Sequence, residues 1–172
     1  MKFKVKDCDI IIDYTFVLVL SFAALFSASQ VIYMLIYCAL HELSHLAALI
    51  IVGGKADMLK FSFYGLALRY TSKLSKKCEI IVLVSGPLAN LILYLLFYDE
   101  LNLILFFLNI LPIYPLDGGR ILELFSYRAS KAASVILIAI LAAASLYFIV
   151  LYRSFSLFLI TVYLIFYSAN YF

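Results

Sequence analysis

The chain has 172 residues, of which 67% are hydrophobic and only 13% are charged. Soluble domains are nearer half apolar and a quarter charged, so this composition predicts a protein embedded in a lipid bilayer. The formal net charge of +3 is too small to indicate a nucleic-acid partner. The cysteines Cys8, Cys38 and Cys78 are too widely spaced to indicate a disulfide framework or a thiolate metal site.

Six apolar segments come close to the length of about twenty residues that a helix needs to cross a bilayer. In chain order they are residues 14–28, 31–52, 80–98, 101–114, 134–151 and 155–169. The fourth ends among Pro112 and Pro115, so its C-terminal part should be broken helix. We therefore expect an all-α polytopic membrane protein with about six transmembrane helices, organised as a single domain over residues 1–172.

Two further segments are predicted not to cross the membrane. Residues 53–77 are basic, and apolar side chains alternate with polar or small ones on both sides of Tyr64-Gly65. This period of two predicts a small interfacial β-hairpin between the second and third spans. Residues 119–131 are predicted to form a short interfacial helix.

The basic residues predict an orientation. Of the 13 Lys and Arg residues, all except Arg153 fall on the side of the membrane that holds both termini. The positive-inside rule then makes the N- and C-termini cytoplasmic. No small-residue cleavage site follows the first apolar run, and we expect that run to be a retained span and not a signal peptide.

The second span contains His41-Glu42-Leu43-Ser44-His45, with the only two histidines of the chain. Residues four apart share one face of a helix, so both imidazoles can reach one ion, while Glu42 lies on a neighbouring face. A zinc ion there acidifies water, and a carboxylate can accept the released proton. A pair of buried polar residues that merely holds helices together is the alternative, but ionisable groups inside a membrane are costly unless they are partnered.

A hydrolytic zinc site usually has three protein ligands and one open position. Asp117 is the best candidate for the third ligand, because it follows the proline-broken fourth span and precedes two glycines. His45 is predicted to lie roughly 12 Å inside the cytoplasmic boundary, at about 1.5 Å per residue. Broken backbone can carry Asp117 back to that depth if it lines a protein-buried cavity. One Zn²⁺ with two neutral imidazoles and the carboxylates of Asp117 and Glu42 also sums to zero charge.

Together these residues resemble the site-2 protease family of intramembrane zinc metallopeptidases, most closely the branch of the stage IV sporulation protein FB. The resemblance covers about residues 30–125, the catalytic core, and rests on three segments. They are His41 to His45, Ser85 to Asn90 and Asn109 to Gly119.

The resemblance implies that His41, His45 and Asp117 ligate zinc and that Glu42 is the general base. It also implies that Asn90 and Asn109 orient substrate or stabilise the oxyanion, although interhelical hydrogen bonding is an equal alternative for both. Gly86-Pro87 is expected to allow a close helix approach or a kink. The hairpin is expected to receive an unwound substrate by strand addition.

By resemblance, the chain cleaves a membrane-associated protein near the cytoplasmic face of a bacterial cell membrane, such as a pro-sigma factor or an anti-sigma protein. Neither a PDZ nor a CBS domain is recognised, so substrate choice is expected to rest on the core or on regulatory membrane proteins. Two other classes stay open: a metal or proton transporter that uses the same polar residues, and an inactive membrane scaffold.

Overall fold

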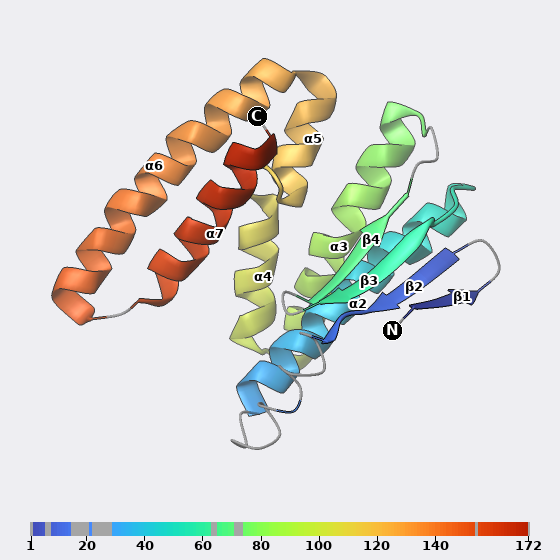
Figure 1. Cartoon of the computed structure of the whole chain (residues 1–172), viewed down its shortest axis with the longest axis horizontal. Coiled ribbons are helices and arrows are strands. Elements are labelled where there is room, and N and C mark those ends of the chain that lie inside the picture. The colour runs from blue at the N-terminus through green and yellow to red at the C-terminus, as the bar shows by residue number, and fades with distance from the viewer. Residues whose placement is uncertain are drawn as a thin grey trace. The chain divides into compact units, whose positions relative to one another are not determined.

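A computed structural model describes residues 2–5, 8–14, 21, 29–62, 65–70, 74–153 and 155–171 (Figure 1). They belong to two compact units, Met1–Phe106 and Phe107–Phe172. Most described residues are helical, as the long apolar segments predict. The predicted first span, residues 14–28, lies outside the described residues apart from Tyr14 and Ser21.

The first unit contains a four-stranded sheet in the order β1-β2-β3-β4. Its strands are β1 (Lys2–Val5), β2 (Cys8–Ile12), β3 (Met58–Ser62) and β4 (Gly65–Arg69). Strands β3 and β4 pair antiparallel in the segment where the alternating pattern predicts a hairpin. The position of these strands at a membrane interface stays a prediction.

The two N-terminal strands are a difference from the predicted all-α class. Strand β2 pairs parallel with β3, with Asp9 opposite Met58 and Ile12 opposite Phe61, and β1 pairs antiparallel with β2. A two-stranded hairpin is marginal by itself, and a sheet of three or more strands is more stable. The N-terminal residues therefore extend the hairpin into a sheet.

Among the described residues, helices α2 (Ser29–Ile51) and α3 (Lys76–Phe97) also belong to the first unit, and α4 (Glu100–Ile110) begins in the first unit and ends in the second. Helix α2 ends at Ile51. Two residues later Gly53 has a φ of 79°, which glycine adopts without strain, and Gly54 N–H donates to the carbonyl of Leu49 at 2.8 Å. Helix α3 begins at Ser75, whose hydroxyl accepts from Cys78 N–H at 3.3 Å. Helix α4 ends two residues before Pro112, as the prolines predict.

Helices α2 and α3 pack against each other, and β4 lies against α2. Ala48 and Leu49 of α2 and Val82 of α3 form a buried apolar cluster. Toward the other end of α2, Tyr37 Oη donates to a carboxylate oxygen of Asp99 at 2.7 Å. These contacts join α2 to α3 and to the turn that follows it.

The second unit contains α5 (Asp117–Phe125), α6 (Tyr127–Tyr152) and α7 (Ser156–Tyr171). The predicted single helix over residues 119–131 is wrong, because the chain breaks at Ser126 and two helices share that stretch. Ser126 has extended backbone, and its hydroxyl accepts from Ala129 N–H at 3.3 Å. This cap starts α6 seven residues before the predicted fifth span.

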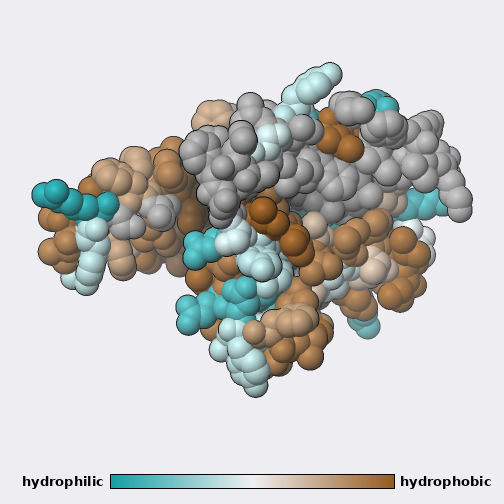
Figure 2. Space-filling model, turned by 90° about the horizontal axis from the view of Figure 1, so that it is seen from below, coloured by the Kyte–Doolittle hydropathy of each residue, from teal (hydrophilic) through white to brown (hydrophobic). Residues whose placement is uncertain are grey.

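Within the described part of the chain, 3 helices are long and apolar enough to cross a membrane: α2, α3 and α6. Helix α4 and residues 157–166 of α7 are apolar but shorter. Large apolar side chains are exposed along these helices, for example Ile51, Val150 and Phe166. Figure 2 shows that much of the surface on the face in view is hydrophobic. Such exposure suits a lipid environment, while the count of six spans stays a prediction.

Candidate metal centre

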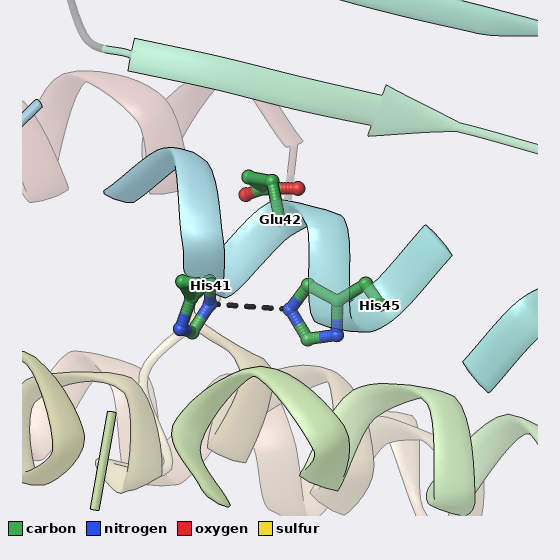
Figure 3. A group of neighbouring side chains, drawn as sticks. All are labelled: His41, Glu42 and His45. Atoms are coloured by element: carbon green, nitrogen blue, oxygen red, sulfur yellow. Dashed lines mark hydrogen bonds between the residues drawn. The ribbon is translucent and has the colours of Figure 1, made fainter. Parts of the chain in front are cut away.

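His41 and His45 project from one face of α2 toward α3, while Glu42 leaves the helix on a neighbouring face (Figure 3). The spacing of four residues places the two imidazoles one above the other, as the sequence predicts. Both are almost fully buried, with 6% and 5% of their surface exposed. The motif therefore lies inside the packed α2–α3 pair and not on an open helix surface.

The two rings present the same nitrogen to each other. Nε2 of His41 and Nε2 of His45 are 3.1 Å apart, and the ring planes are nearly perpendicular at 89°. A carboxylate oxygen of Glu42 completes a group of donor atoms that all lie within 4.8 Å of one another. Two ligand atoms on one tetrahedral zinc ion, each about 2.0–2.1 Å from the metal, are about 3.3 Å apart. The pair of imidazoles therefore fits a zinc ion by both chemistry and spacing.

The opposite nitrogen of each ring is engaged by α3. His45 Nδ1 is 2.7 Å from the carbonyl oxygen of Val82, and Ser85 Oγ lies 3.4 Å from the same nitrogen. His41 Nδ1 is 3.0 Å from Nδ2 of Asn90. Partners on the non-ligating nitrogen fix the orientation of a metal-binding imidazole. Helix α3 thus holds both rings with their Nε2 atoms together.

Gly86 makes this close packing possible. A Cβ at this position would lie within 2.7 Å of His41 Cε1 and closer still to the ring of His45. No ordinary side chain tolerates such contacts, so any substitution must displace an imidazole or separate the helices. The sequence predicts that Gly86-Pro87 allows either a close approach or a kink, and at Gly86 the structure confirms the close approach.

Asp117, the predicted third ligand, is the first residue of α5 in the second unit and is only 6% exposed. The segment before it packs on the backbone of α5. A Cβ on Gly118 would lie 2.6 Å from the carbonyl oxygen of Leu111, and one on Gly119 would collide with Ile113 and Tyr114. The two glycines therefore let the proline-broken segment fold back on the first turn of α5.

Two buried serines of α6 hold the same segment. Ser134 Oγ accepts from Tyr114 N–H at 2.9 Å, and Ser130 Oγ donates to the carbonyl oxygen of Gly119 at 3.0 Å. Both serines are fully buried. They fix the backbone on either side of Asp117, and so they position its carboxylate within the second unit.

The structure brings His41, Glu42, His45 and Asn90 together in the first unit. Asn109, near the end of α4, belongs to the second unit together with Asp117. The assignment of all six as site residues stays a prediction. Residues that the sequence analysis did not place at the site include Val82 and Ser85, which contact His45. Val82 acts through its backbone carbonyl, which no residue type reveals.

Replacing Gly86 with alanine should abolish metal binding while leaving the chain inserted in the membrane. The added methyl must displace an imidazole, because both rings would be much closer to it than van der Waals contact allows. Zinc bound to the purified protein, measured by atomic emission, is expected to fall well below that of the wild type. Leu88→Ala, an exposed position on the same helix, is the matched control. Full zinc occupancy in Gly86→Ala would show that the contact does not position the rings.

Comparisons with known proteins bear on both units. The family model described as Peptidase family M50 matches residues 94–152, which include Asn109 and Asp117 but not His41 to His45. No curated protein sequence matches the chain. A solved structure titled "Site-2 Protease from Methanocaldococcus jannaschii" is similar with a TM-score of 0.66 and 24% sequence identity, over 99% of this chain and 94% of that chain. At this identity the similarity shows a shared fold.

Proposed function

We propose that this chain is an intramembrane zinc metalloendopeptidase that hydrolyses a peptide bond of a membrane-associated protein. The observation that carries the proposal is the buried pair His41 and His45, whose Nε2 atoms lie 3.1 Å apart beside the carboxylate of Glu42. The match to Peptidase family M50 and the fold shared with a site-2 protease support the same class of enzyme.

In this proposal His41, His45 and Asp117 hold one zinc ion per chain. When bound, zinc supplies a Lewis acid that polarises the scissile carbonyl and acidifies water. The imidazoles suit this ion because neutral nitrogen donors and a carboxylate are common ligands of catalytic zinc. The buried serines and the glycines around Asp117 support its assignment as a ligand, since they fix the backbone from which its carboxylate projects.

Glu42 acts as the general base. Its carboxylate accepts a proton from the attacking water as the water oxygen bonds to the scissile carbonyl carbon. It then returns that proton to the amide nitrogen as the C–N bond breaks. Asn109 is proposed to donate a hydrogen bond to the oxyanion that forms between these steps.

The substrate is proposed to bind as an added strand at β4. The sheet has two edges, β1 and β4, and β4 is the edge strand that packs against α2. An extended peptide paired with β4 would run beside the helix that bears Glu42. Strand addition uses backbone hydrogen bonds, so it suits substrates whose transmembrane helix unwinds before cleavage.

The proposed setting is a bacterial cell membrane with both termini in the cytoplasm, and the released fragment enters the cytoplasm. The sequence motifs resemble those of the stage IV sporulation protein FB. A pro-sigma factor or an anti-sigma protein is therefore the proposed substrate class, with regulatory membrane proteins as further partners.

Glu42→Gln should abolish cleavage without loss of zinc. Glutamine keeps the size of the side chain but cannot accept the proton, and a general base contributes about 10²–10⁴-fold to a rate. The assay co-expresses each variant with a tagged pro-sigma factor or anti-sigma protein and measures the released fragment and the bound zinc. Cleavage at the wild-type rate would exclude Glu42 as the base. Metal flux into liposomes by Glu42→Gln would instead indicate a transporter.

Asp117→Ala should lower the zinc affinity, because two imidazoles alone leave the ion without its third protein ligand. Zinc stoichiometry of the purified variant is expected to fall below one per chain after dialysis against a weak chelator. Glu123→Ala, which removes another carboxylate from α5, is the matched control and should retain zinc. If Asp117→Ala binds zinc as tightly as the wild type, the third ligand has been assigned wrongly.

A photoreactive amino acid placed at Ala67 of β4 should cross-link to the substrate in the Glu42→Gln background, where the substrate is bound but not cut. The same amino acid at Lys4 of β1, on the opposite edge of the sheet, is the control and should give little product. Equal yields at the two edges would contradict binding at β4.

A further inference from the structure

The two imidazoles of the metal centre have α3 partners of different chemistry. A neutral histidine carries one N–H and one lone pair, so a ring that ligates through Nε2 must carry its proton on Nδ1. That proton needs an acceptor when it is buried. For His45 the acceptor is the carbonyl oxygen of Val82, 2.7 Å from Nδ1. A carbonyl cannot donate, so this contact alone sets His45 for ligation through Nε2.

The α3 partner of His41 is a side chain. His41 Nδ1 lies 3.0 Å from the carboxamide of Asn90, a group that contains both a donor and an acceptor. Nδ2 faces the ring, while Oδ1 is buried without a hydrogen-bond partner among the described residues. Rotating the carboxamide by half a turn exchanges the two atoms and places Oδ1 on Nδ1–H. Asn90 can therefore hold His41 in either tautomer.

We infer that Asn90 is a positioning residue of the metal centre, whose Oδ1 accepts the Nδ1–H of His41 and so makes His41 Nε2 available to the ion. This inference rests on the zinc site of the proposed function. It assigns Asn90 to His41, which agrees with the interhelical hydrogen bond that the sequence analysis gives as an equal alternative to a contact with substrate. Outer-shell acceptors of this kind fix the tautomer and raise the basicity of a ligating imidazole.

The position of Asn90 on α3 supports this assignment. Gly86 and Asn90 are four residues apart and share the face of α3 that meets the imidazoles. Gly86 lets the rings approach, and Asn90, one turn later, contacts the ring of His41. Asn90 is fully buried. Its carboxamide is thus held between the helices, where its partner is an imidazole.

Two substitutions at Asn90 distinguish the role of its acceptor oxygen from that of its donor nitrogen. Asn90→Asp keeps an acceptor oxygen of similar size and removes the donor, whereas Asn90→Leu removes both. Zinc dissociation constants of the purified full chain, measured by competition with a chelating dye, are expected to rise about 10–100-fold in Asn90→Leu. In Asn90→Asp they should equal or fall below the wild-type value. Cobalt substituted into Asn90→Asp should retain the wild-type visible absorption spectrum.

A third variant tests whether the loss of any buried side-chain amide weakens zinc binding. Asn102 in α4 is as fully buried as Asn90, and its amide atoms form no hydrogen bond to His41 or His45 among the described residues. Asn102→Leu should therefore change thermal stability without changing zinc affinity. The inference is overturned if Asn102→Leu weakens zinc as much as Asn90→Leu, or if Asn90→Asp weakens it as much as Asn90→Leu.

Unchanged zinc affinity in Asn90→Leu with reduced cleavage would also overturn the inference, and would return Asn90 to the oxyanion role. A wild-type protein that binds no zinc is a different failure, because it contradicts the proposed function itself.

Discussion

The close contact between α2 and α3 at Gly86 is the constraint on which the metal centre depends. Two imidazoles cannot enter an apolar helix pair at low cost unless their polar atoms are satisfied there. The absence of a side chain at Gly86 brings the backbone of α3 near enough for Val82 and Asn90 to reach the Nδ1 atoms. The same close contact therefore packs the two helices together and provides hydrogen-bond partners for the buried imidazoles.

Other contacts of the first unit support this packing. Tyr37, one turn before His41 on α2, is tied to Asp99 at the turn after α3. Beyond the other end of the motif, Leu49 is fully buried next to Val82 in the apolar cluster. Along α2 the histidines therefore lie between the Tyr37–Asp99 hydrogen bond and the apolar contact of Leu49 with Val82. Both contacts keep α2 and α3 in register. In the second unit, serines of α6 and two glycines have the corresponding role for Asp117.

The sequence predicts α2, α3 and the shared face of His41 and His45, because these follow from local apolar runs and from helical spacing. It also contains a signal for β1, since Lys2, Phe3, Lys4 and Val5 alternate polar and apolar residues, but lysines this close to a membrane span equally indicate its orientation. The parallel pairing of β2 with β3 joins segments about fifty residues apart, and local patterns carry no information on such pairing. Ser126 is a common type of helix cap, but serine is also common elsewhere, so its presence alone does not predict the break between α5 and α6.

Among the site residues, the limits of prediction follow from chemistry. The type and spacing of His41, Glu42 and His45 indicate a metal site. An asparagine such as Asn90 fits a hydrogen-bond donor to the oxyanion and a partner of an imidazole equally well. Only the structure, by placing its carboxamide 3.0 Å from His41, favours one of the two. Zinc, the third ligand and the substrate stay predictions.

The carbonyl oxygen of Val82, which contacts His45, cannot be removed by changing the amino acid at position 82. Because the acceptor is a main-chain oxygen at position 82, every amino acid placed there still provides it. Mutational scanning of α3 would therefore register position 82 only through its packing volume, and the carbonyl that accepts from His45 would escape detection. A backbone ester at the following residue, which weakens that carbonyl as an acceptor, would be needed to make its contribution visible.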